Sequence, residues 1–335
     1  MGVRRRAWAE ARLLGGVLIL AVVIWRLGPE PFLDGLRGLG LGTLLAGIAI
    51  GALTTVCSAW RWRVVAAALG HGLPLPGAIA AYYRSQFLNC ALPGGVVGDV
   101  HRGLQHGIHV GDLGRGLHAV VWERVAGQVV LAAIALAVLL TLPSPVHAAM
   151  PAVVTAGAVT AGFLLLTGRG VVRHGPARLA GAVRTAGVEA RSELLQPATV
   201  RPVLVTSLLV VGGHLGMFLL ACRAAGVHGT PQQLLPLALL VLLAAAVPLN
   251  VGGWGPREGA AAWVFAATEW GAGTGAAVAT AFGVLTLVAV LPGAVVLLAG
   301  RRHPRPGAIR PAGTRREPMA DVVHSGTRGD GAAHG

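Results

Sequence analysis

The amino-acid sequence predicts an all-α, polytopic integral membrane protein. Of its 335 residues, 54% are apolar and only 12% are charged, whereas about 25% of the residues of a soluble domain are charged. The apolar residues are mostly Ala, Leu and Val, and they accompany 50 Gly but only two Tyr. This composition is typical of packed transmembrane helices rather than of a β-barrel with aromatic girdles.

Six apolar segments are long enough to cross a bilayer, since a hydrocarbon core about 30 Å thick needs roughly 20 apolar residues per helix. They are residues 13–27, 39–59, 118–142, 148–167, 203–225 and 275–299. No small-residue cleavage site follows the first segment, which we therefore interpret as an uncleaved anchor. Residues 301–335 are rich in Gly, Pro and Arg and predict a disordered basic tail, which leaves residues 1–300 as one membrane domain.

The arginines that flank these segments predict the orientation in the membrane. The basic regions are the amino terminus, the turn with Arg61 and Arg63, the 168–202 loop and the tail. The alternate connections, residues 28–38, 143–147 and 222–232, contain only Arg37 and Arg223. We therefore predict a multi-pass protein of the inner (cytoplasmic) membrane with both termini in the cytoplasm.

Two further apolar segments, residues 75–98 and 233–258, run into Gly- and Pro-rich breaks that cannot be continuous helix. The residues that mark the breaks are Asn89, Pro93, Gly94, Gly95 and Gly98 in the first, and Pro248, Asn250, Gly252, Gly253 and Gly255 in the second. Counted from the first proline of each break, Gly98 and Gly253 both fall at plus five, and Arg102 and Arg257 both fall at plus nine. The two breaks therefore match in register.

Each break also lies between two apolar spans, so the sequence predicts a duplicated unit, residues 39–142 and 203–299. The arginine bias places the two leading spans in opposite directions, which makes the units inverted repeats. If both broken segments are re-entrant, their irregular tips meet within the membrane. Such an inverted pair is typical of a transporter site near the midplane, whereas packing glycines and ordinary proline kinks are the alternative.

Each break carries an arginine and a carboxylate, Asp99 with Arg102 and Arg257 with Glu258. Charges within the membrane are costly and mark a pathway or a bound headgroup. Arginine suits phosphate because its planar fork donates two parallel hydrogen bonds. We predict that Arg102 and Arg257 bind a lipid phosphate, and that Asp99 and Glu258 position these arginines or contact a cationic headgroup. The further candidates for headgroup binding are Asn89, Asn250, Glu123 and Arg124.

Three motifs carry a family resemblance. They are Asn-x-x-x-Pro-Gly-Gly-x-x-Gly-Asp-x-x-Arg within residues 82–102, the Glu123-Arg124 pair, and Pro-x-x-x-Gly-Gly-Trp-Gly-x-Arg-Glu at residues 248–258. Over roughly residues 10–300, the chain resembles the lysylphosphatidylglycerol synthase transmembrane-region family, flippase-like proteins related to the amino-terminal membrane half of multiple peptide resistance factor. The resemblance implies re-entrant helices and lipid transfer between leaflets. It does not imply synthesis of lysyl lipid, because no soluble aminoacyl-transferase domain follows the last span.

Glu123 and Arg124 begin a predicted span, where they either form an ion pair that faces the bundle or line the mouth of the cavity. His214 lies in the middle of a span and predicts a hydrogen bond between helices rather than a proton relay. His106, His109 and Asp112 share a Gly-rich loop, but no second shell accompanies them. We therefore predict no metal and no cofactor.

Several other functions are excluded or lack a motif. The sequence contains no Lys, so neither a phosphate-cradling P-loop nor a Schiff-base enzyme can be built. No basic face interleaved with aromatic residues indicates a nucleic-acid partner. Cys57, Cys90 and Cys222 form neither a disulfide framework nor a CxxC site. Because no catalytic motif is present, we do not expect an enzyme.

The function we expect is a flippase- or scramblase-like protein that binds or moves an anionic phospholipid or lipid-linked precursor. Its expected partners are anionic membrane lipids, and the sequence is also compatible with a homo-oligomer and with separately encoded envelope-lipid enzymes. A membrane scaffold that docks such enzymes on the 168–202 loop is one alternative. An enzyme that acts on a lipid-linked substrate through Asp99 or Glu258 is another.

Overall fold

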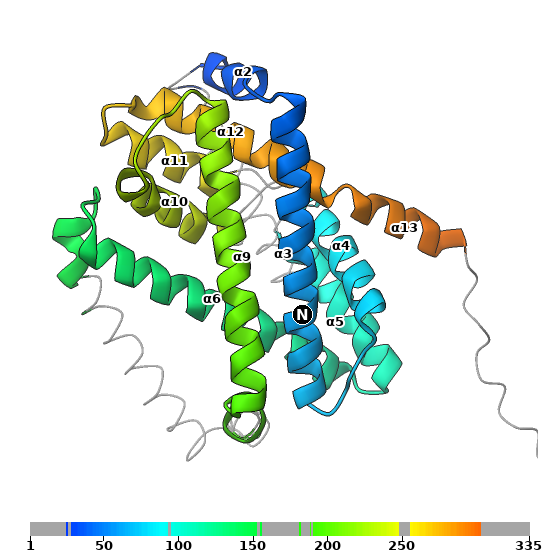
Figure 1. Ribbon diagram of the computed structural model, residues 1–335. Helices are drawn as coiled ribbons and strands as arrows, with labels where there is room; N and C mark the ends of the chain where they lie inside the picture. Colours follow the sequence, from blue (N-terminus) through cyan, green and yellow to red (C-terminus); the bar gives the residue numbers. More distant parts are fainter. Residues whose placement is uncertain are drawn as a thin grey trace, which may run out of the picture.

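The structure, a computed structural model, describes residues 25, 28–92, 95–152, 155, 181, 188, 190–247 and 255–302. Within these residues the chain is helical and contains no strand (Figure 1). The shorter elements are α2 (Glu30–Arg37), η1 (His147–Ala149) and the π-helical turn η2 (Ala190–Leu194).

Four described stretches are long and apolar enough to cross a membrane. They are α3 (Leu41–Ala68), α6 (Leu113–Thr141), α9 (Pro197–Ala224) and residues 271–299, where α12 (Gly271–Val290) is followed at Leu291 by α13 (Pro292–Arg302). At 1.5 Å per residue, each extends about 42 Å, more than a hydrocarbon core requires. Four of the predicted spans are thus confirmed, whereas most of 13–27 and of 148–167 lies outside the described residues.

Helix α3 is longer than the sequence predicts. The predicted span ends at residue 59 and is followed by a basic turn, but the helix continues to Ala68. Arg61 lies inside this helix and is buried, whereas Arg63 is exposed. The interpretation of Arg61 as a marker at the membrane surface is therefore wrong, because an ion pair inside the bundle holds its charge.

Each predicted break lies between two short helices. Helix α4 (Leu75–Ala91) is followed by α5 (Val97–Val110), and α10 (Pro231–Ala245) by α11 (Pro256–Ala266). Gly95 and Gly255 have φ angles of +62° and +134°, a backbone conformation that favours glycine. Pro256 then occupies the first position of α11, where a missing N–H costs nothing. Pro93, Gly94 and residues 248–254 lie outside the described residues.

The same order of helices, long, short, short and long, occurs twice: α3, α4, α5 and α6, and then α9, α10, α11 and α12. Helices α3 and α9 lie side by side and run in opposite directions (Figure 1). Near one end Gly47 lies beside Met217, and near the other Arg61 bonds Ser207. The contacts between the halves also correspond, because α4 packs on α12 as α10 packs on α6. These correspondences are those that an inverted pair of units would produce.

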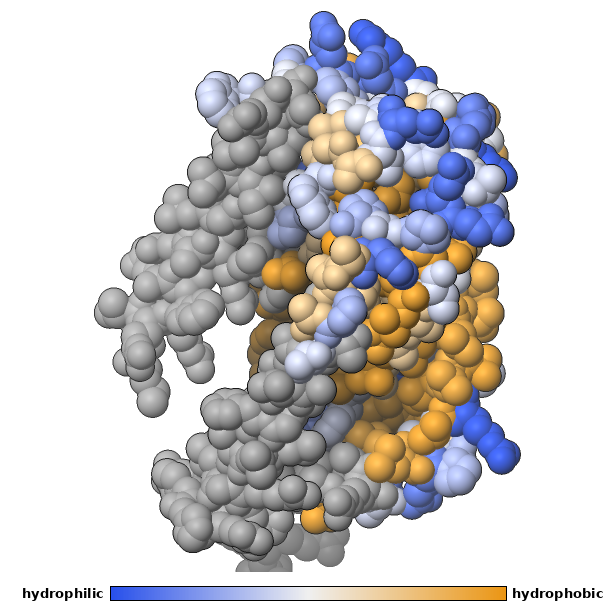
Figure 2. Space-filling view, turned by 90° about the vertical axis from the view of Figure 1, so that its left-hand side faces the viewer, coloured by the Kyte–Doolittle hydropathy of each residue, from blue (hydrophilic) through white to orange (hydrophobic). Residues whose placement is uncertain are grey.

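The surface also has the pattern of a membrane protein. Figure 2 shows apolar residues over the middle of the visible face and hydrophilic residues gathered towards its two ends. The exposed apolar side chains on the long helices include Leu41, Leu45 and Leu53 on α3 and Leu204, Val205 and Leu208 on α9. A lipid environment satisfies such an exposed belt, which water would not.

Candidate functional site

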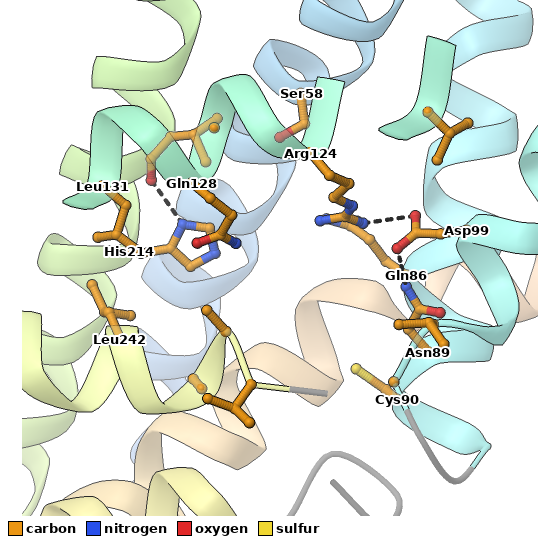
Figure 3. Close-up of a pocket in the computed structure, with 18 of the residues that line it drawn as sticks. Ser58, Gln86, Asn89, Cys90, Asp99, Arg124, Gln128, Leu131, His214 and Leu242 are labelled. Carbon is orange, nitrogen blue, oxygen red and sulfur yellow. Dashed lines mark hydrogen bonds and ion pairs between the residues drawn. The ribbon is translucent and has the colours of Figure 1, made fainter. Parts of the chain in front are cut away.

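A cavity of about 670 Å³ lies between the two broken segments (Figure 3). The first segment contributes Asn89, Cys90, Gly95, Val96 and Asp99, and the second contributes Ala245, Ala246, Val247, Pro256 and Arg257. The long helices add Arg61, Arg124, Gln128 and His214. The geometry therefore brings the two breaks to one shared space.

Glu123 on α6 is the centre of a buried ionic network beside this cavity. Its Oε1 accepts hydrogen bonds from Arg61 Nε at 2.9 Å and Arg61 Nη2 at 2.5 Å, and from the Tyr82 hydroxyl at 3.2 Å. Its Oε2 accepts from Arg102 Nη2 at 3.0 Å. The carboxylate is completely buried, so one side chain joins α3, α4, α5 and α6.

Asp99 in the first turn of α5 is the second carboxylate of the network. Its Oδ1 accepts hydrogen bonds from Arg124 Nη2 at 2.8 Å, Ser85 Oγ at 3.0 Å and Arg102 Nη2 at 3.1 Å. Its Oδ2 accepts from Asn89 Nδ2 at 3.1 Å. The helix dipole also favours a negative charge at this position. Asp99 is therefore held by four side chains from α4, α5 and α6.

Arg102 lies behind the cavity wall and is not among the residues that line it. Only 1% of Arg102 is exposed, and its guanidinium lies 4.5 Å from the centre of the Trp62 ring and 4.2 Å from that of Tyr82. The neighbouring Arg124 has 38% of its side chain exposed and lines the cavity. Arg102 therefore does not line the cavity, whereas Arg124, which the sequence also singles out, does.

Asn89 and Gly98 close the first break. The Asn89 Oδ1 atom accepts a hydrogen bond from the Gly98 backbone N–H at 2.7 Å, while its amide nitrogen donates to Asp99. A Cβ atom on Gly98 would lie 1.9 Å from the Ser85 carbonyl oxygen, so only glycine permits this approach of α5 to α4. The predicted ligand Asn89 therefore also fastens the end of α4 to the start of α5.

The second break holds its charges differently. Glu258 is completely buried, and its Oε2 accepts a hydrogen bond from the Gly255 N–H at 2.6 Å, as a carboxylate does when it caps a helix. Its Oε1 accepts from Arg257 Nε at 2.8 Å and from Arg257 Nη2. Arg257 lines the cavity and lies 5.4 Å from the centre of the Phe282 ring. Glu258 therefore positions Arg257 and caps α11.

The charges of this region do not cancel. Within the described residues, the first network combines three arginines, Arg61, Arg102 and Arg124, with two carboxylates, Asp99 and Glu123. Arg257 and Glu258 form a balanced pair. One positive charge is left over in a region of low dielectric constant, where it attracts an anion strongly.

Sequence reasoning missed the roles of Arg61 and His214. The sequence signal for a buried Arg61 is that the helix-forming segment continues beyond it to Ala68. Its partner Glu123 is 62 residues away along the chain, so the pairing itself has no local signal. Among the described residues, the hydrogen bond of His214 is not to another helix as predicted but to its own, with Nδ1 2.7 Å from the Val210 carbonyl oxygen. His214 also lines the cavity.

The three residues considered as a metal site have other contacts. His106 is on α5 rather than in a loop, and its ring meets the Trp62 ring edge-on at 5.4 Å. The His109 Nδ1 atom bonds the Gln105 carbonyl oxygen. Asp112 caps α6, and the hydrogen bond from the Arg115 N–H at 3.1 Å lowers the pKa of its carboxyl group. Among the described residues no group of three potential ligands gathers.

Comparison with known proteins gives the family. No curated protein and no solved structure matches the chain. The family model described as the lysylphosphatidylglycerol synthase TM region matches residues 12–293, which include both breaks and every residue of the ionic network. The chain is therefore a multi-pass membrane protein with a lipid-related function and belongs to the lysylphosphatidylglycerol synthase transmembrane-region family.

Proposed function

We propose that the protein binds an anionic lipid by its phosphate in the cavity between the two breaks and passes the headgroup between the leaflets, as a flippase or scramblase does. The observation that carries the proposal is the cavity itself, lined by Arg124 from the first half and Arg257 from the second. The positive charge left over in the adjoining network favours an anion there.

The size and the rim of the cavity suit a headgroup whose acyl chains remain in the bilayer. Its volume of about 670 Å³ lies within the range of small-molecule sites. Val100, Val121 and Val125 line the cavity and are also exposed at the surface. Apolar side chains at this rim can contact acyl chains while the arginines bind the phosphate.

The arrangement of the halves supports alternating access. The ionic network holds α3, α4, α5 and α6 together, whereas the second half packs mainly through apolar side chains such as Phe218, Phe265 and Phe282. The halves run in opposite directions around the shared cavity. Rocking one half against the other exposes such a site to each leaflet in turn.

We propose that the end where α3 finishes and α9 begins faces the cytoplasm. Exposed arginines at this end include Arg63, Arg115 and Arg201. Helix α2, at the opposite end, carries Glu30 and Asp34 beside Arg37. The excess of arginine places the first of these ends inside, in agreement with cytoplasmic termini in the inner membrane.

The test is leaflet exchange of short-chain fluorescent lipids in proteoliposomes. We expect phosphatidylglycerol to exchange faster than phosphatidylcholine, and an Arg124→Ala/Arg257→Ala variant to lose at least tenfold in rate, since a hydrogen bond to a charged group contributes about 1.5–3 kcal/mol. Arg63→Ala, an exposed arginine on α3, is the matched control and should leave the rate unchanged.

The proposal fails if the folded double variant exchanges phosphatidylglycerol at the wild-type rate. Absence of exchange by folded wild-type protein would also refute it. That result would turn attention to the scaffold alternative, which deletion within the 168–202 loop would test. The proposal assigns no chemical reaction to Asp99 or Glu258, and recovery of a covalently changed lipid would favour an enzyme instead.

A further inference from the structure

The two walls of the cavity differ in chemistry. Figure 3 shows Arg124 and Asp99 together on one side, and Gln128 and His214 together on the other. All four residues line the cavity. One wall is therefore ionic, whereas the other offers neutral hydrogen-bonding groups.

The ionic wall has no carboxylate available to a cationic headgroup. Among the described residues that line the cavity, Asp99 is the one carboxylate, and its oxygens already accept hydrogen bonds from four side chains. Glu123 and Glu258 are completely buried and paired with arginines. An ammonium group in the cavity would meet positive charge without a counter-ion.

The neutral wall suits hydroxyl groups. A carbonyl oxygen can only accept, so His214 Nδ1 donates to the Val210 carbonyl, and in the neutral form of the imidazole Nε2 is then an acceptor. Gln128 carries both an amide donor and an amide acceptor. A hydroxyl, which donates and accepts, can bond both side chains, whereas a bare phosphate oxygen can only accept from Gln128.

The spacing of Arg124 and Gln128 joins the two walls. The residues are four positions apart on α6 and so lie on the same face of the helix, with Cβ atoms about 5–6 Å apart. A phosphate bound by Arg124 would therefore place a short polyol substituent within reach of Gln128. His214 contributes from the neighbouring helix α9.

We propose that the cavity selects lipids whose phosphate carries a neutral, hydroxyl-bearing headgroup, such as glycerol or a sugar, and disfavours headgroups with an ammonium group. Arg124 binds the phosphate, and Gln128 and His214 bind the hydroxyls and set the specificity. This assignment rests on the proposed function, because it names the class of lipid that the same cavity takes.

The test compares three fluorescent lipids in the proteoliposome assay: phosphatidylglycerol, phosphatidic acid, which lacks the hydroxyls, and phosphatidylethanolamine, which carries an amine. The variants are Gln128→Met and His214→Phe, which keep the approximate shape of each side chain. Size-exclusion profiles and thermal denaturation establish that both variants are folded. The readout is the rate ratio of phosphatidylglycerol to phosphatidic acid.

We expect wild-type protein to exchange phosphatidylethanolamine most slowly. The double variant should lower the rate ratio of phosphatidylglycerol to phosphatidic acid about tenfold, which corresponds to about 1.4 kcal/mol. Soluble glycerol 3-phosphate on both sides of the membrane should compete only weakly, since it lacks acyl chains. Competition at the concentration of the lipid would instead assign the cavity to a free polyol phosphate.

The outcomes separate this assignment from the proposed function. If phosphatidylglycerol and phosphatidic acid both exchange in an Arg124-dependent manner but the ratio is unchanged in the folded double variant, transport stands and the hydroxyl assignment is wrong. Exchange of phosphatidylethanolamine as fast as phosphatidylglycerol would overturn it as well. If wild-type protein exchanges none of the three lipids, both proposals fall.

Discussion

Replacing Glu123 with glutamine removes one charge from the ionic network while keeping the shape of the side chain. The Glu123 Oε1 atom receives three hydrogen bonds, two from Arg61 and one from Tyr82, so the amide oxygen of the variant should take this position. The amide nitrogen then occupies the place of Oε2, which lies 3.0 Å from Arg102 Nη2. Two donors would face each other in a site without water access.

The expected cost follows from burial. Removing one partner of a buried ion pair destabilises a protein by about 3–5 kcal/mol, and retention of the hydrogen bonds from Arg61 and Tyr82 favours the lower end of that range. We therefore expect Glu123→Gln to lower the free energy of unfolding by about 3 kcal/mol. Arg102→Met removes the opposing donor, so the two substitutions together should cost less than the sum of their separate costs by about 1–3 kcal/mol.

Unfolding by SDS in mixed micelles measures these free energies. Glu269→Gln, the same change at an exposed carboxylate, is the matched control and should change the stability little. If Glu123→Gln costs no more than Glu269→Gln, the ionic network does not hold the first half together. Strict additivity with Arg102→Met would refute the direct contact between the two side chains.

Other predictions concern the breaks and the cavity. Gly98→Ala should prevent α5 from approaching α4 and lower the thermal denaturation temperature, whereas Gly42→Ala, at the corresponding second position of α3, has open space and should not; equal effects would contradict the role of Gly98. Tyr82→Phe should lose the hydrogen bond to the buried carboxylate but keep its stacking on arginine, and so cost about 1.5 kcal/mol in SDS unfolding; a cost near zero would show that the ring alone matters. Cys90 lines the cavity while the other two cysteines are buried, so it should be labelled first. The ratio of its reaction rate with the anionic reagent MTSES to that with the cationic reagent MTSET should be higher than the same ratio for a free thiol. A lower ratio would contradict a positive cavity.

The sequence was sufficient for the features that depend on local composition. Long apolar runs predicted α3, α6, α9 and the 271–299 span, because the bilayer thickness fixes their length. Glycine and proline predicted both breaks, because Gly95 and Gly255 adopt positive φ angles and Pro256 begins α11.

The sequence was not sufficient to say which arginine faces the cavity. That depends on the rotation of α5 against α6, which is fixed where Gly103 and Gly107 meet Gly116 so closely that a Cβ atom on Gly116 would lie 2.3 Å from a backbone nitrogen. This contact turns Arg102 inward and leaves Arg124 at the cavity. Packing between distant segments leaves no periodic signal in the sequence. The sequence alone therefore could not show that Arg124 on α6 lines the cavity and that Arg102 on α5 does not.

The ionic network has a consequence for how the protein is made. Arg61 enters the bilayer with α3, but the carboxylate that neutralises it arrives only with α6, 62 residues later along the chain. A lone arginine within a membrane helix costs up to about 2.5–3.5 kcal/mol during insertion. The helices of the first half therefore reach their final depth together, and biogenesis of this half is complete only when α6 has been synthesised.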